Sequence, residues 1–114
     1  MIKLYGIANC DTVKQARAWL DAAGIAYAFV DFKKTPPEAA QVSHWCKQLG
    51  ADTVLNRRGT TWRQLDAATQ ARAATTAGAI RLLVANPSAI KRPVVESGAT
   101  LLIGFDAAQY AKQL

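Results

Sequence analysis

The stretch that decides the fold is YGIANCDTVKQARAWL, residues 5–20, because a strand-like pattern changes to a helix-like one inside it. Residues 3–7 alternate as in a β-strand, and after a polar break at Asn9 apolar residues recur at helical spacing. The apolar face of this helix consists of Val13, Ala16, Leu20 and Ala23. Gly24 ends the helix and residues 26–32 form a second strand-like run, so the sequence predicts two parallel strands joined by a crossover helix.

The middle of the chain has a helical pattern. TPPE at residues 35–38 predicts a helix start, with Thr35 as the N-cap and Glu38 at the third helical position. The polar segment LNRRGTTWRQL, residues 55–65, is expected to form a loop. Alanine-rich helical segments follow, from about residue 66 to residue 85, and end before a proline.

The last part of the chain returns to strands. Residues 93–96 and 100–103 predict a β-hairpin, and residues 106–114 predict a closing helix. This order of elements predicts an α/β protein with a thioredoxin-like fold and a helical insertion, approximately residues 36–86, between its βαβ and ββα halves. We expect residues 1–114 to form this single domain.

Fourteen Lys and Arg residues against eight Asp and Glu residues give the chain a net charge of +6. Such a charge indicates anionic partners, either nucleic acid or small anions. The basic residues are scattered and no nucleic-acid-binding signature surrounds them, so a concave site for a small anion fits better than a nucleic-acid surface. A basic surface that only aids solubility is the alternative.

The cysteines and the start of the chain bear on the compartment. The segment MIKLYGI is neither a signal peptide nor a membrane anchor, which predicts a cytoplasmic protein with no membrane partner. Cys10 and Cys46 form no CxxC spacing and no Cys/His metal spacing. We therefore expect reduced thiols, no metal site and no bound cofactor.

Cys10 is the candidate nucleophile. A thiol reacts as its thiolate, and the partial positive charge and unsatisfied N–H groups of a helix N-terminus favour that anion. With Asp11 or Thr12 as the N-cap, Cys10 stands one or two residues before the helix. Lys14 adds positive potential one turn into the helix, and the Asn9 side chain can donate a hydrogen bond to the sulfur or to a bound ligand.

Cys46 and His44 are interpreted differently. Cys46 lies in the apolar stripe of its helix, where packing explains it, and a resolving role depends on a distance that the sequence does not give. His44 lies beside this stripe with no partner at catalytic or ligand spacing, which predicts a surface residue.

Arg58 and Arg92 are the candidate anion-binding residues, because a planar guanidinium binds carboxylates and oxyanions through two parallel hydrogen bonds. Arg58 lies in a Gly-Thr-Thr loop, where binding groups are often placed. Arg92 precedes Pro93 at the entry to the third strand, where an X–Pro bond of a thioredoxin fold faces the thiol loop. We predict that the Arg92–Pro93 bond is cis and that Arg92 lies near Cys10. A surface ion pair of Arg92 is the alternative.

Four segments taken together resemble the arsenate-reductase-like (ArsC/Spx) family, and most closely its YffB-type members: YGIANCDTVKQARAWL, LNRRGTTWRQL, NPSAIKRPVV and LLIGF. The resemblance covers essentially the whole chain. It implies a thioredoxin-like fold, a cytoplasmic location and glutathione-linked thiol chemistry. It makes Cys10 the catalytic cysteine, Arg58 and Arg92 the anion-binding arginines, and Pro93 the proline that faces the active site.

Two departures from the family pattern narrow the expected function. Arsenate reductases carry a third arginine after the last strand, where this chain has Gly104–Phe105–Asp106, and Spx-type regulators carry a CxxC switch, where Val13 stands three residues after Cys10. We therefore expect a monothiol oxidoreductase with glutathione as co-substrate and a small anionic or disulfide substrate. A protein-binding regulator of the Spx type, with a partner such as RNA polymerase, and an arsenate reductase are the alternatives.

Overall fold

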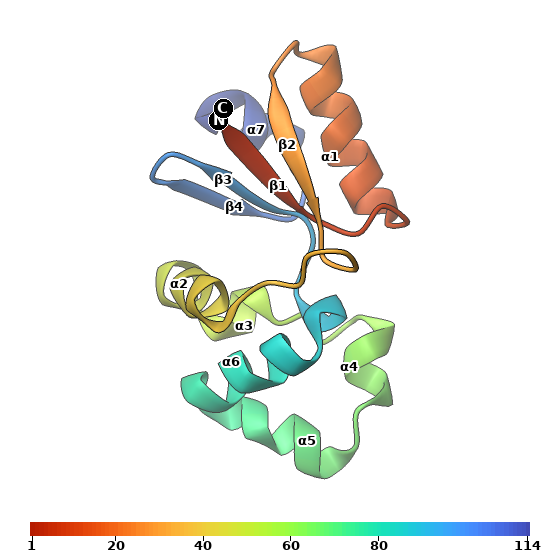
Figure 1. Ribbon diagram of the computed structural model, residues 1–114, viewed down its shortest axis with the longest axis vertical. Helices are drawn as coiled ribbons and strands as arrows, with labels where there is room; N and C mark the ends of the chain where they lie inside the picture. Colours follow the sequence, from red (N-terminus) through yellow and green to blue (C-terminus); the bar gives the residue numbers. More distant parts are fainter. The chain divides into compact units, whose positions relative to one another are not determined.

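The computed structural model describes residues 1–114, and the chain forms two compact units (Figure 1). The sheet unit comprises Met1–Thr35 and Arg92–Leu114, and the helical unit comprises Pro36–Lys91. The insertion predicted at approximately residues 36–86 falls within the helical unit, and its bounds and the single domain over residues 1–114 stay predictions. None of the helices combines the length and the apolar character needed to span a lipid bilayer.

The sheet unit contains a four-stranded mixed sheet in the order β2-β1-β3-β4. The strands are β1 (Ile2–Gly6), β2 (Tyr27–Asp31), β3 (Val94–Ser97) and β4 (Thr100–Ile103). β1 pairs in parallel with β2, and the pairs β1–β3 and β3–β4 are antiparallel. Helix α1 (Asp11–Ala22) connects the two parallel strands, and α7 (Ala107–Gln113) follows β4. The predicted thioredoxin-like α/β fold, with helices inserted between its βαβ and ββα halves, is confirmed.

One row of cross-strand neighbours carries the core of the sheet unit. Leu4 lies opposite Val95, and Val95 lies opposite Leu102. Because paired residues in neighbouring strands point to the same face of a sheet, these three side chains form one apolar row. The helices contribute four buried residues to the same cluster: Val13, Ala16, Leu20 and Tyr110. Burial of each large apolar side chain contributes about 1.5–3 kcal/mol, so the inner face of α1 holds the helix against the sheet.

Helix α1 starts earlier than either predicted cap. Its N-cap is Cys10 itself, rather than Asp11 or Thr12, with extended backbone angles (φ −136°, ψ 124°). The Cys10 carbonyl accepts the first helical hydrogen bond, from the Lys14 N–H at 2.9 Å. Asp11 therefore becomes the first helical residue, where its carboxylate complements the positive end of the helix dipole.

The helical unit is built from short helices. They are α2 (Ala39–Leu49), α3 (Ala51–Val54), α4 (Thr60–Gln64), α5 (Ala67–Ala71) and α6 (Thr76–Ala85), with 3₁₀ turns η1 (Arg72–Ala74) and η2 (Pro87–Ala89). The prediction of Thr35 as N-cap was wrong, because α2 is capped by Glu38, which forms a capping box with Gln41. A residue that precedes proline is disfavoured in helical conformation, so Pro36 and Pro37 delay the start of the helix.

Two further segments differ from the sequence prediction. The expected loop at residues 55–65 contains the short helix α4. The alanine-rich segment is divided at Thr75, whose side chain accepts a hydrogen bond from the Gly78 N–H at 3.0 Å and caps α6. A threonine at this position satisfies an otherwise unpaired N–H group, which makes the break between η1 and α6 favourable.

Candidate functional site

Cys10 lies at the junction between β1 and α1, partly exposed and packed on one side against the core of the sheet unit. Its thiol is free. The Cys10 side chain forms no conventional capping hydrogen bond, as expected of a neutral thiol, which is a weak acceptor. The Val13 and Thr12 N–H groups of the first helical turn nevertheless lie close enough to the sulfur to stabilise a thiolate.

The pKa of Cys10 is lowered, as the sequence predicts for a reactive thiol. Burial acts in the opposite direction and raises the pKa, and it is the largest single influence. The Val13 N–H, the Arg92 side chain and the Thr12 N–H together outweigh burial, because each of them stabilises the thiolate. The helix N-terminus and one arginine therefore make Cys10 the better nucleophile of the two thiols.

Arg92 reaches Cys10 because of the strand register. Val94 at the start of β3 pairs with Tyr5 near the end of β1, so the residues that precede β3 lie beside the segment that follows β1. The Nε atom of Arg92 is buried, which shields its guanidinium charge from full screening by water. Arg92 lowers the pKa of Cys10 both by hydrogen bonding to the thiolate and through its charge.

Pro93 anchors Arg92 at this place. The Arg92–Pro93 peptide bond is cis, as predicted, and the Pro93 side chain is fully buried. The Pro93 carbonyl accepts a hydrogen bond from the Gly104 N–H at 2.8 Å. Strand β3 begins one residue later than predicted, at Val94, since proline has no N–H to give to the ladder.

Asn9 and Lys14 flank Cys10 in the sequence and are the two polar neighbours predicted to assist it. Both side chains are exposed, Asn9 in the turn before Cys10 and Lys14 in the first turns of α1. The charge that lowers the pKa of Cys10 comes from Arg92 and not from Lys14. A contact of Asn9 with a bound ligand stays a prediction.

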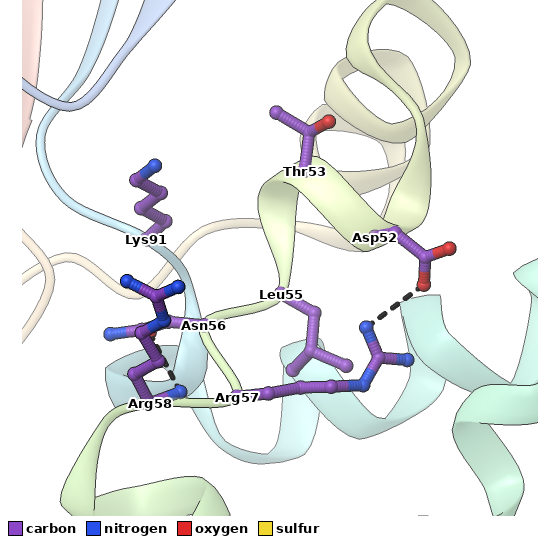
Figure 2. A pocket seen from close by; sticks show the side chains of 7 residues that line it. All are labelled: Asp52, Thr53, Leu55, Asn56, Arg57, Arg58 and Lys91. Atoms are coloured by element: carbon purple, nitrogen blue, oxygen red, sulfur yellow. Dashed lines mark hydrogen bonds and ion pairs between the residues drawn. The ribbon is translucent and has the colours of Figure 1, made fainter.

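Arg58 belongs to the helical unit, where it lines a pocket of about 500 Å³ (Figure 2). Its backbone N–H donates to Asn56 Oδ1 at 3.1 Å, and its guanidinium forms no hydrogen bond or ion pair. Arg57 is engaged instead, in an ion pair with Asp52 at 2.9 Å and over the ring of Trp62, 5.3 Å from its centroid. The approach of Arg58 to Cys10 stays a prediction.

Cys46 and His44 lie on different sides of α2. Cys46 is buried beside Val42 and Trp45, and burial raises the pKa of its thiol. Its thiol is therefore less reactive than that of Cys10. His44 is exposed, as predicted.

Several residues that line the pocket beside Arg58 were not predicted from the sequence. Asn56, Asp52 and Lys91 line the same pocket as Arg58, yet no spacing in the sequence connects Lys91 with the others. The role of Asn56 in the turn could have been predicted, because an Asn side chain in a loop often accepts a hydrogen bond from the backbone N–H two residues later. No group of three or more His, Cys, Asp or Glu side chains gathers as metal ligands would.

Comparison with known proteins identifies the family. The model of the ArsC family matches residues 5–113. The chain belongs to the ArsC family. This ArsC-family chain is similar over 98% of its length to the solved structure of the protein YffB, with 47% identity, a TM-score of 0.95 and coverage of 97% of that chain.

Two further relatives of this ArsC-family chain come from named bacteria. An arsenate reductase (ArsC) related protein from Brucella melitensis has a solved structure with 41% identity and a TM-score of 0.77, covering 98% of this chain and 92% of that one. A Haemophilus influenzae protein of uncharacterised function is 37% identical over 110 residues, 96% of each chain. The fold is therefore the arsenate-reductase-like form of the thioredoxin fold.

Proposed function

We propose that this protein is a glutathione-linked monothiol oxidoreductase whose nucleophile is Cys10. The observation that carries the proposal is the environment of the Cys10 sulfur, where N–H groups of α1 and the Arg92 guanidinium lower the pKa of a partly exposed thiol. A structural cysteine needs none of these groups. The chemistry requires a supply of reduced glutathione, so we place the protein in the cytoplasm.

The proposed reaction is thiol–disulfide exchange in two steps. The Cys10 thiolate attacks one sulfur of a disulfide, the S–S bond breaks, and the second sulfur leaves as a thiolate while Cys10 enters a mixed disulfide. A glutathione thiolate then attacks the substrate-derived sulfur of this mixed disulfide and releases Cys10 as a thiolate. The disulfide between glutathione and the substrate fragment is the product, so no electrons are gained or lost overall in this exchange. A second glutathione thiolate can attack the glutathione sulfur of that product, which releases the substrate fragment as a thiolate and joins the two glutathiones as oxidised glutathione.

Arg92 has two tasks in this proposal. It stabilises the Cys10 thiolate before attack, and its guanidinium binds a negative group of the incoming substrate, because a planar fork of donors matches carboxylates and oxyanions. The leaving Cys10 thiolate of the second step is stabilised by the same N–H groups and the same arginine. Arg58 is proposed as a second anion-binding residue.

The test is reaction with oxidised glutathione followed by mass spectrometry of the intact chain and its peptides. We expect one glutathione adduct on Cys10, no adduct in Cys10→Ser, and removal of the adduct by reduced glutathione. Cys46→Ala is the matched control, because its buried thiol should make no difference to the adduct. An adduct confined to Cys46, with Cys10 unmodified, contradicts the proposal.

Arsenate reduction is a second candidate, favoured by the 41% identity with the Brucella melitensis protein described as related to arsenate reductase. The segment after β4 is less favourable to it. In the stretch Gly104–Phe105–Asp106, where an arsenate reductase is expected to carry an arginine, this chain has none, and Asp106 instead caps α7 by accepting a hydrogen bond from the Gln109 N–H at 3.1 Å. Arsenate-dependent oxidation of glutathione by the wild-type chain, absent in Cys10→Ser, would establish this activity.

A further inference from the structure

Two buried hydrogen bonds of the sheet unit lead from the closing helix α7 to the residue that follows Arg92. The Tyr110 hydroxyl on α7 donates to the Gly104 carbonyl at 2.7 Å. The Gly104 N–H donates to the Pro93 carbonyl at 2.8 Å. All three residues are buried, and Pro93 directly follows Arg92 in the sequence. These two bonds, the Tyr110–Pro93 link, therefore connect α7 to the backbone beside Arg92.

The hydroxyl at the start of this link is held in place. The ring of Tyr110 lies edge-on against Trp19, with 5.5 Å between the ring centroids, and against Phe105, with 5.1 Å. Burial raises the pKa of Tyr110, so its hydroxyl keeps the proton that it donates. Because the Gly104 carbonyl is buried, water does not easily replace this donor. The bond from Tyr110 to Gly104 is therefore a lasting part of the folded sheet unit.

Gly104 needs this restraint, because its φ of 78° lies in the left-handed region, where glycine has wide freedom. The strand ladder gives little help at this place. The pairing of β3 with β1 and with β4 ends at Val94, which lies opposite Tyr5 and Ile103. Proline has no N–H to give to a ladder, so the bond between the Gly104 N–H and the Pro93 carbonyl continues the ladder towards Arg92.

We propose that Tyr110 and Gly104 are positioning residues for Cys10, because they hold the Pro93 backbone and with it the approach of Arg92 to the sulfur. The inference rests on the proposed function, in which Arg92 stabilises the Cys10 thiolate. A hydrogen bond weakens steeply as its distance and angle depart from the ideal values. A small displacement of Arg92 therefore reduces the stabilisation of the thiolate, although no atom of Tyr110 needs to touch Cys10.

The test is the pKa of Cys10 in Tyr110→Phe, which keeps the ring and removes the hydroxyl. The pKa is measured by pH-dependent alkylation, followed by mass spectrometry of the peptide that contains Cys10. We expect the pKa to rise and alkylation at neutral pH to slow about twofold, less than in Arg92→Ala. Tyr27→Phe is the matched control, because it removes a hydroxyl of the same unit that accepts from Arg17 Nε at 3.1 Å. An unchanged Cys10 pKa in Tyr110→Phe, or an equal rise in Tyr27→Phe, overturns the inference.

A double variant separates positioning from a general loss of stability. If Tyr110 acts through Arg92, Tyr110→Phe should change the Cys10 pKa much less in the Arg92→Ala chain than in wild type. An equal rise in both backgrounds overturns the inference, because the hydroxyl would then act without Arg92. Leu20→Val, at a fully buried position of α1 outside the link, is the stability control. It should lower the unfolding midpoint and leave the Cys10 pKa unchanged, and a rise as large as that in Tyr110→Phe overturns the inference.

The inference and the proposed function can fail separately. A glutathione adduct on Cys10 of the wild-type chain, together with an unchanged Cys10 pKa in Tyr110→Phe, defeats only the inference. A raised Cys10 pKa in Tyr110→Phe, without any adduct on Cys10 of the wild-type chain, defeats the proposed function and supports the positioning role of Tyr110.

Discussion

Arg92 lies close enough to Cys10 to lower the pKa of its thiol, by hydrogen bonding to the thiolate and through its charge, although the two residues lie far apart in the sequence. The antiparallel pairing of β1 and β3 makes this contact, since Tyr5 pairs with Val94. The two basic residues predicted to act on Cys10 therefore differ in their effect on its pKa. Arg92 stabilises its thiolate, while Lys14 points from an exposed helix face where water screens its charge.

Replacement of Arg92 should therefore affect Cys10 more than replacement of Lys14. We expect Arg92→Ala to raise the pKa of Cys10 and to slow its alkylation at neutral pH severalfold, because less thiolate is present. Lys14→Ala should slow it much less. Rates of iodoacetamide modification, followed by mass spectrometry, measure the difference. Larger slowing in Lys14→Ala than in Arg92→Ala would show that Arg92 is not the main cation that stabilises the Cys10 thiolate.

The two cysteines should differ strongly in alkylation. Cys46 is 3% exposed and burial raises its pKa, so neither access nor ionisation favours its reaction. We expect one alkyl group per folded chain, on Cys10, and two in denaturant. Intact-mass spectrometry counts them. Rapid double modification of the folded chain at neutral pH is the contrary result.

The lowered pKa of Cys10 also makes stability depend on pH. Because the folded state releases the Cys10 proton more easily than the unfolded state, the stabilisation is fully present above the unfolded thiol pKa, about 8.5, and is lost as the pH falls through the lowered folded pKa. The free energy of unfolding of wild type relative to Cys10→Ser should therefore be larger at about pH 9 than at about pH 5. Cys46, whose raised pKa acts oppositely at high pH, is present in both chains and cancels. An equal difference at both pH values contradicts the account.

Tyr110 should be important for the stability of the sheet unit. Its buried hydroxyl donates to the Gly104 carbonyl at 2.7 Å, and its ring packs edge-on against Trp19 and Phe105. Tyr110→Phe keeps the ring but leaves that carbonyl without its donor, which should cost about 1–2 kcal/mol. Urea denaturation monitored by circular dichroism measures the loss. No change in the unfolding midpoint would mean that the hydrogen bond contributes nothing net.

Gly78 should tolerate no side chain. A Cβ atom there would overlap the Arg72 carbonyl oxygen and lie 3.0 Å from Thr75 Oγ1, at the tight junction of η1 and α6. Gly78→Ala should therefore destabilise the chain by about 1–3 kcal/mol, despite the higher helix propensity of alanine. Ala77→Ser, at an exposed neighbouring position, is the control for thermal denaturation. A Gly78→Ala chain as stable as wild type would contradict the packing described at this junction.

Much of the fold could be predicted because local patterns and chain order agree. Three patterns depend only on residues that are near in the sequence. They are the alternation before Gly6, the helical stripe of Val13, Ala16 and Leu20, and the proline after Arg92. Helix caps were less predictable, because two or three polar residues compete for each position. Cys10 took a place expected of Asp11 or Thr12, since its carbonyl already accepts the first helical bond.

The parts of the candidate site that escaped prediction depend on contacts between distant segments. No local sequence feature distinguishes Arg57 from Arg58. Only the folded chain shows that Arg57 forms an ion pair with Asp52 and lies over the ring of Trp62, whereas Arg58 does neither. Lys91 likewise enters the pocket through its backbone bond to Val54, which no sequence spacing indicates.

The central claim is that Cys10 is a thiolate-forming nucleophile, and its pKa measured by pH-dependent alkylation tests this most directly. The measurement uses the Cys46→Ala chain, so that one thiol is followed. The account predicts a pKa below that of an unperturbed thiol, about 8.5, and a rise in Arg92→Ala. A pKa at or above about 8.5 that Arg92→Ala leaves unchanged would contradict it, and would make Cys10 a structural residue.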